Sequence, residues 1–147
     1  MKQQKIMYLS GPITENDREV AFKKFADAEW KWCAEGWRVF NPMKNGLPAD
    51  AQWHCHMAVD LYRLGRCDAV YMMEGWQDSH GAVLELHYAL ATSKQVFFAT
   101  MPDKDFMKAL VSMANLIRQA LLIDGNLMFD LDFYADQCME AGCYTPL

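Results

Sequence analysis

Short apolar runs alternate with longer amphipathic segments along about the first hundred residues of the chain. The apolar runs end at Gly, Pro, Asn or Asp and predict buried strands at residues 5–10, 38–41, 69–73 and 95–99. The segments between them have helical spacing and predict helices at residues 17–35, 53–65 and 79–92. This alternation indicates an α/β fold, in which a mostly parallel sheet of four to five strands is covered by helices on both faces.

The alternation ends after Pro102. Residues 105–122 predict one long helix and residues 132–141 a final one, both facing solvent or a partner. A chain of 147 residues fits a single domain. We therefore expect a core at residues 5–100 and a helical extension at residues 103–147.

Composition narrows the class of protein. The net charge of −5 gives no basic patch of the kind that binds duplex nucleic acid, and no apolar run approaches the ~20 residues that span a bilayer. Five Cys without a CxxC pair or a secretion signal predict reduced thiols and a cytoplasmic location. The triplet at residues 54–56 (His-Cys-His) has no second ligand cluster at zinc spacing, so neither a metal nor a cofactor is expected.

Glu85 occupies an unusual helical position. At about 100° per residue it shares a face with Gly81, Ala82 and Ala89, the smallest residues of the predicted helix. A carboxylate that must touch a ligand needs empty space beside it and backbone that can approach closely. The alternative is a surface Glu on a helix whose small face packs against the sheet.

Asp60 is unusual in the same way. It falls on the stripe of its helix that should be buried, with Trp53, Met57 and Leu64. Its nearest polar neighbours are expected to be His56 and Arg63. Two inward carboxylates form either structural ion pairs or a site in which burial and repulsion separate their pKa values. The second arrangement suits cleavage of a glycosidic bond.

The carboxyl ends of parallel strands meet at one edge of a sheet, where ligands bind. Loops follow the first three strands at residues 10–14, 42–51 and 74–79. Ser79 is a good helix cap, and the free amides of a helix start bind anions such as a 5′-phosphate. The alternative for Ser79 is a helix cap without a ligand. Gly11 suits the close approach of a phosphate, but Gly11 with Pro12 is also typical of an ordinary turn.

Four segments in order resemble the nucleoside 2-deoxyribosyltransferase superfamily, and more narrowly its phage and bacterial DUF4406 branch. They are residues 7–13 (MYLSGPI), residues 39–42 (VFNP), Asp60 with residues 67–70 (CDAV), and residues 79–85 (SHGAVLE). The resemblance covers residues 5 to about 100. It implies a flavodoxin-like three-layer fold and chemistry at the N-glycosidic bond of a nucleoside or nucleotide.

The resemblance also implies roles for single residues. Glu85 matches the nucleophile, which attacks C1′ and forms a glycosyl-enzyme intermediate. Asp60 matches the acid that assists departure of the base, and Tyr8 the tyrosine that holds the nucleophile. Relatives complete their sites with a neighbouring subunit, which predicts a homo-oligomer.

One departure from the family pattern bears on the substrate. True transferases carry an Asp six positions before the nucleophile, and this chain has Ser79 there. Nucleotide N-hydrolases of the superfamily also carry Ser there, and a hydroxyl tolerates a phosphate dianion that a carboxylate would repel. The resemblance therefore favours a nucleoside 5′-monophosphate and hydrolysis. The expected substrate-binding residues are Ser10, Gly11, Pro12, Ser79 and Gly81 around the sugar phosphate, and Trp53 stacked on the base. Alternatives are a non-catalytic module that binds a nucleotide or an ADP-ribose-like signal, and deoxyribosyl transfer to a second base.

Overall fold

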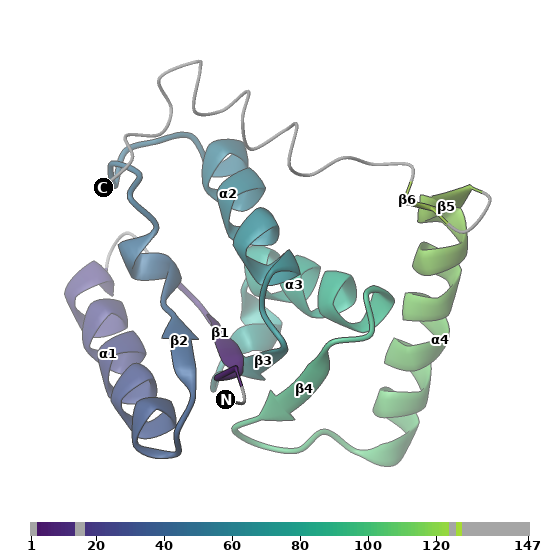
Figure 1. Ribbon diagram of the computed structural model, residues 1–147, viewed down its shortest axis with the longest axis horizontal. Coiled ribbons are helices and arrows are strands. Elements are labelled where there is room, and N and C mark those ends of the chain that lie inside the picture. The colour runs from purple at the N-terminus through teal and green to yellow at the C-terminus, as the bar shows by residue number, and fades with distance from the viewer. Residues whose placement is uncertain (1–2, 14–16, 124–125, 128–147) are drawn as a thin grey trace.

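The structure is a computed structural model that describes residues 3–13, 17–123 and 126–127. Its elements in chain order are β1 (Ile6–Ser10), α1 (Arg18–Ala34), β2 (Arg38–Phe40), α2 (Trp53–Gly65), β3 (Ala69–Met72), α3 (His80–Ala91), β4 (Gln95–Phe98), α4 (Lys104–Leu121), β5 (Leu122–Ile123) and β6 (Asn126–Leu127) (Figure 1). The strands and helices predicted up to residue 121 are all present. The apolar and helical periodicities were therefore sufficient to locate them.

The first four strands form one sheet in the order β2-β1-β3-β4. All three pairings are parallel, and β1 lies between β2 and β3 with Tyr8 opposite Phe40 on one side and Val70 on the other. Parallel pairing confirms the predicted α/β fold, which is consistent with a flavodoxin-like three-layer architecture. It also brings the carboxyl ends of the strands to one edge.

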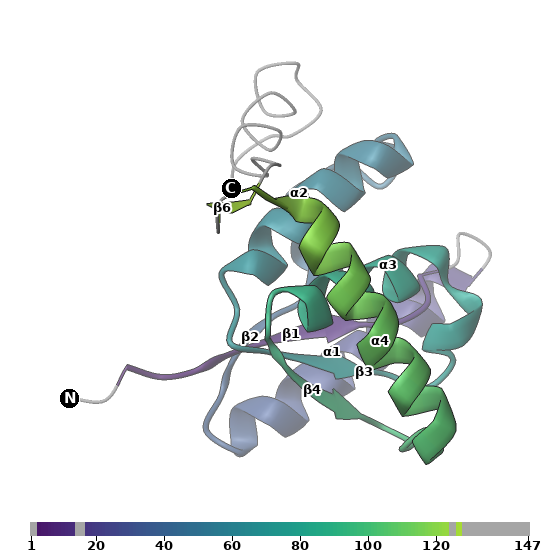
Figure 2. The same ribbon diagram turned by 90° about the vertical axis from the view of Figure 1, so that its right-hand side faces the viewer.

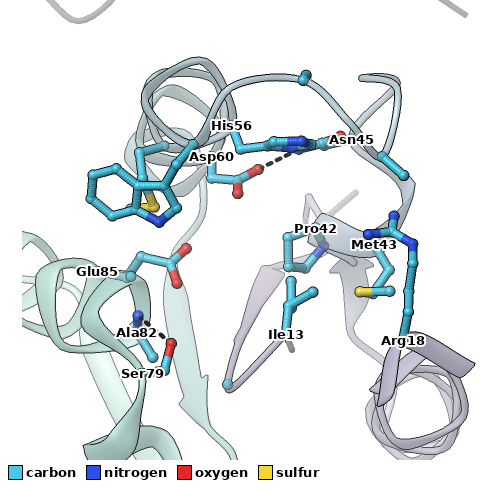
Figure 3. A pocket seen from close by; sticks show the side chains of 16 residues that line it. Ile13, Arg18, Pro42, Met43, Asn45, His56, Asp60, Ser79, Ala82 and Glu85 are labelled. Carbon is cyan, nitrogen blue, oxygen red and sulfur yellow. Dashed lines mark hydrogen bonds between the residues drawn. The ribbon is translucent and has the colours of Figure 1, made fainter. Parts of the chain in front are cut away.

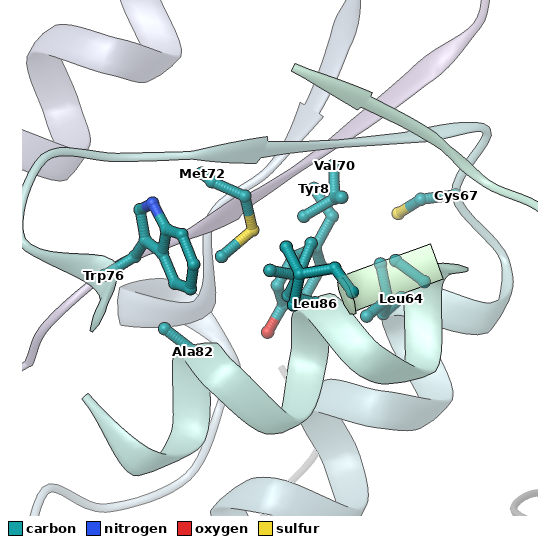
Figure 4. Close-up of a cluster of buried hydrophobic side chains, with 10 residues drawn as sticks. Tyr8, Leu64, Cys67, Val70, Met72, Trp76, Ala82 and Leu86 are labelled. Atoms are coloured by element: carbon teal, nitrogen blue, oxygen red, sulfur yellow. The ribbon is translucent and has the colours of Figure 1, made fainter. Parts of the chain in front are cut away.

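The alternation of side chains along β1 separates two cores. Met7 and Leu9 pack against Phe25 of α1 on one face of the sheet. Tyr8 points to the opposite face, into a core that includes Leu86 of α3 (Figure 4). Ser10 follows two residues later on the same face as Tyr8. The pleat thus directs two hydroxyl groups of β1 toward α3.

The extension after β4 differs in part from the prediction. Leu110 and Ala114 of α4 are buried, and Leu110 joins the core beneath α3. Figure 2 shows α4 lying across α3, so one face of this helix contacts the domain rather than solvent or a partner. The short β5 and β6 pair antiparallel where only helix had been predicted.

The helix predicted at residues 132–141 lies outside the described residues. Of the helices within the described part of the chain, none combines the length and apolar character needed to cross a membrane.

Candidate active site

A cavity of about 200 Å³ lies at the carboxyl edge of the sheet. The loop after β1 contributes Gly11 and Ile13, the loop after β2 contributes Asn45, and further wall residues come from α2, α3 and the start of α1 (Figure 3). Asp60 and Glu85 both line it, one from α2 and the other from α3. The structure therefore brings together the two carboxyl groups singled out by their positions in the sequence.

Two hydroxyl groups of β1 hold the carboxyl group of Glu85 in place. Only 6% of the residue is exposed, and its Oε1 accepts a hydrogen bond of 2.9 Å from the Ser10 hydroxyl. The Tyr8 hydroxyl donates to Oε2. Two hydroxyl donors fix the orientation of the carboxyl group and stabilise its ionised form. The surface-Glu alternative is wrong, although Ala82 and Ala89 on the same face do pack in the core.

Gly81 borders the cavity, as its predicted role in binding substrate requires. A Cβ at this position would also lie 3.1 Å from the Met57 sulfur, so the missing side chain admits a residue of α2 as well. Gly11 borders the cavity too, and a Cβ there would meet Met73 Cβ at 3.0 Å.

Asp60 is 7% exposed, and its partner comes from a loop rather than from its own helix. Asn45 Nδ2 donates to Asp60 Oδ1 at 3.0 Å. His56 contacts the same nitrogen of Asn45, and Arg63 lies over the ring of Phe40. Among the described residues, no Lys or Arg pairs with either cavity carboxyl group. Ion pairing does not explain their burial.

Burial changes the protonation of both acids. It raises the pKa of Asp60 from 3.8 to about 7. Burial, together with the charge of Asp60, raises the pKa of Glu85 from 4.5 to about 8. The hydrogen bonds from Tyr8 and Ser10 act in the opposite direction on the pKa of Glu85. Two acids that share a cavity titrate as a unit, because ionising both would place like charges together. Near neutral pH the pair retains about one proton.

Tyr8 stays protonated in this setting. Burial and the nearby charges of Asp60 and Glu85 hold the pKa of its phenol well above the ordinary value of 10.0. The phenol is therefore a permanent hydrogen-bond donor to Glu85. It lies behind the carboxyl group, with none of its surface exposed.

Some of the expected substrate-binding residues border the cavity and others do not. Ser79 caps α3 by accepting from the Ala82 amide at 3.2 Å, and it borders the cavity. Trp53 also borders it and is 60% exposed, which corrects its assignment to a buried stripe. Ser10 is fully buried and its hydroxyl serves Glu85, so it does not reach a phosphate in this arrangement. Pro12 lies beside Gly75 and not at the cavity.

Residues that the sequence reasoning did not assign also line the cavity. Arg18, at the start of α1, lies across the cavity from Glu85 and Ser79 (Figure 3). Asn45 and His56 line the cavity as well. The position of His56 one helical turn before Asp60 was a usable signal, whereas nothing local marks Arg18 or Asn45.

A metal centre is not formed by the part of the chain that the structure describes. Its His, Cys, Asp and Glu side chains make no group of three that would hold an ion. The His-Cys-His triplet is divided, since Cys55 is buried and His56 turns to the cavity.

The fold and the site define an α/β domain with paired buried carboxyl groups at the carboxyl edge of a parallel sheet. The family model described as "Domain of unknown function (DUF4406)" matches residues 5–98, and the chain belongs to this family. The matched range contains the whole parallel sheet, Asp60 and Glu85. No curated protein matches the chain.

Proposed function

We propose that this protein cleaves the N-glycosidic bond of a nucleoside 5′-monophosphate and releases the free base. The observation that supports this most is the pair of buried carboxyl groups, Glu85 and Asp60, at one cavity with about one proton between them. Such cleavage requires an ionised carboxylate as nucleophile and a protonated acid for the leaving group. One proton on the pair supplies both forms.

The hydrogen bonds favour one assignment of the two roles. Glu85 has two hydroxyl donors and Asp60 one amide donor, so Glu85 is the more firmly oriented of the two and is the better placed nucleophile. Its oxygen attacks C1′ as the bond from C1′ to the base nitrogen breaks. The electron pair of that bond goes to the base, which takes a proton from Asp60.

The second step restores the site. The Asp60 carboxylate removes a proton from water, whose oxygen attacks C1′ and displaces Glu85. The products are the free base and a sugar 5-phosphate. A second base in place of water would give transfer instead, by the same two carboxyl groups.

The start of α3 suits the phosphate. Ser79 borders the cavity, and the free amides and dipole of a helix start attract anions. Glu85 lies six residues further along, at about 9 Å along the helix axis for a rise of 1.5 Å per residue. One helix would thus bind the phosphate and present the nucleophile to the sugar. Arg18 supplies a cation elsewhere on the cavity wall.

A panel of ribo- and deoxyribonucleoside monophosphates tests the proposal, with chromatographic detection of free base. Glu85→Gln keeps the shape of the side chain and should abolish release. Glu35→Gln changes an exposed residue at the far end of α1 and should retain it. If the wild-type protein binds nucleotides but releases no base over a day, the chain is a binding module and the proposal is rejected.

A further inference from the structure

The Asn45 side chain has a fixed orientation. Its Oδ1 accepts a hydrogen bond of 3.0 Å from the backbone amide of Leu47. This places Nδ2 on the other side, 3.0 Å from Asp60 Oδ1 and 3.1 Å from His56 Nδ1. An amide nitrogen carries two hydrogens and accepts none. Asn45 is buried and uses both hydrogens, so each facing atom must be an acceptor.

The contact with Asn45 determines which ring nitrogen of His56 carries the hydrogen. Nδ1 must present a lone pair to Asn45, so the ring is neutral and carries its hydrogen on Nε2. The carbonyl of Pro48 accepts from the imidazole, and with Nδ1 occupied the donor is Nε2. Burial lowers the pKa of His56, which favours the same neutral form. His56 thereby connects α2 to two points of the loop after β2.

For Asp60, the contact selects an oxygen. Oδ1 accepts from Asn45, so a proton on this carboxyl group belongs on Oδ2. Figure 3 shows that oxygen turned away from Asn45, on the side of Glu85. A proton on Oδ1 would leave a hydroxyl oxygen, the poorer acceptor, facing the Asn45 hydrogen, whereas a proton on Oδ2 leaves a carbonyl oxygen there.

We propose that Asn45 is a positioning residue: by occupying Oδ1 it leaves Oδ2, which faces the cavity, as the oxygen of Asp60 that receives the proton shared with Glu85. This extends the proposed function, since that proton is the one delivered to the departing base. The hydrogen-bond pattern itself does not depend on the reaction. Asn45 and its hydrogen-bond partners form this pattern without a substrate.

Other charged groups act on the same proton. Glu85 of α3 faces Asp60, and the charges of the two groups act on each other. Tyr8 of β1 lies behind Glu85 and donates a hydrogen bond to it. Arg18, at the start of α1, acts on His56 and lowers its pKa. Asn45 is the donor that contacts Asp60 Oδ1, and this contact distinguishes the two oxygens.

Nitrogen-15 NMR of the imidazole rings tests the pattern directly in the wild-type protein. The chain has four His, and the spectrum of His56→Gln assigns the signals of residue 56. We expect neutral His56 with hydrogen on Nε2 and a hydrogen-bonded lone pair on Nδ1. Hydrogen on Nδ1 of neutral His56 would overturn the proposal, without any variant of Asn45 and without a substrate.

Asn45→Asp is the matched change, because it keeps the shape and replaces the donor with an acceptor. His56 should then move its hydrogen to Nδ1, with a raised pKa beside the new carboxylate. The proton of Asp60 should then move to Oδ1, where it lies between the carboxyl groups of Asp60 and of the substituted residue 45. Removing a positioned general acid lowers rates about 10²–10⁴-fold, so kcat for base release should fall by about 10² or more with KM changed little.

His56→Gln is the control. A Gln oxygen can still accept from Asn45 and a Gln nitrogen can donate to Pro48, so the hydrogen bond from Asn45 to Asp60 should remain. Because residue 56 lines the cavity, kcat itself is expected to change, but the pKa values of its pH profile should match those of the wild-type protein. An unchanged His56 tautomer or an unchanged pH profile in Asn45→Asp would refute the positioning role. Absence of base release from every nucleotide would reject the proposed function instead, and the NMR result would still decide the role of Asn45.

Discussion

Replacing Glu85 with Gln should make the protein more stable at high pH. In the wild-type protein, burial and the charge of Asp60 raise the pKa of Glu85 from 4.5 to about 8. A raised folded-state pKa means that the folded protein holds the proton more tightly than the unfolded chain. This contribution to stability is complete below the unfolded pKa and is lost as pH rises through the folded value. Gln carries no proton to lose, so its variant lacks this dependence.

The size of the effect follows from the shift. From 4.5 to about 8 is about 3.5 pH units, and at about 1.4 kcal/mol per unit this corresponds to about 5 kcal/mol. That figure is an upper limit, because Asp60 carries part of the coupled titration. Between about pH 5 and about pH 9 we expect the wild-type free energy of unfolding to fall by roughly 3 kcal/mol more than that of Glu85→Gln.

Urea unfolding followed by Trp fluorescence at both pH values measures this difference. At the lower pH the variant should be slightly less stable, by about 1 kcal/mol, because the amide replaces one acceptor facing Tyr8 or Ser10. At the higher pH the order should reverse. Glu35→Gln is the control for removal of an exposed carboxylate and should follow the wild-type protein. Parallel pH dependences for wild type and Glu85→Gln would refute the argument that burial of this charge is costly.

Other substitutions test the remaining contacts. Tyr8→Phe removes a donor that lowers the pKa of Glu85, so that pKa should rise and the acid limb of the base-release pH profile should move to higher pH; an unmoved limb would contradict the contact. Ser79→Asp places a carboxylate at the start of α3, and kcat/KM should fall about tenfold or more for a monophosphate relative to the unphosphorylated nucleoside. An equal effect on both substrates would remove the phosphate from this position. Leu86→Ala leaves a cavity between α3 and the sheet and should cost about 2–5 kcal/mol in urea unfolding, whereas Leu84→Ala, at an exposed position of the same helix, should cost much less.

The exceptions to the hydrophobic pattern were the most informative part of the candidate site. Glu85 and Asp60 were found because each carboxylate falls on a helical face that should be buried, and both are buried. Ser79 was found from the rules for helix starts, and it caps α3 as expected. These signals are local, since each depends on residues within a few positions of one another.

The partners of those residues could not be found in the same way. Tyr8 and Glu85 are 77 residues apart, and their hydrogen bond depends on the pleat of β1 and on the packing of α3 against it. Asn45 lies in an irregular loop, where no periodicity indicates which way an amide points. The Met57 sulfur beside Gly81 likewise comes from another helix, and nothing near Gly81 in the sequence indicates that contact.

The sequence by itself determined the strands, the helices and the two unusual acids, because backbone propensity and side-chain periodicity act over a few residues. Only the tertiary structure decided how the acids are protonated and held. A pKa depends on burial and on groups brought close from β1, α2, α3 and the loop after β2. A hydrogen bond depends on the position of single atoms, which is fixed only when those elements pack together.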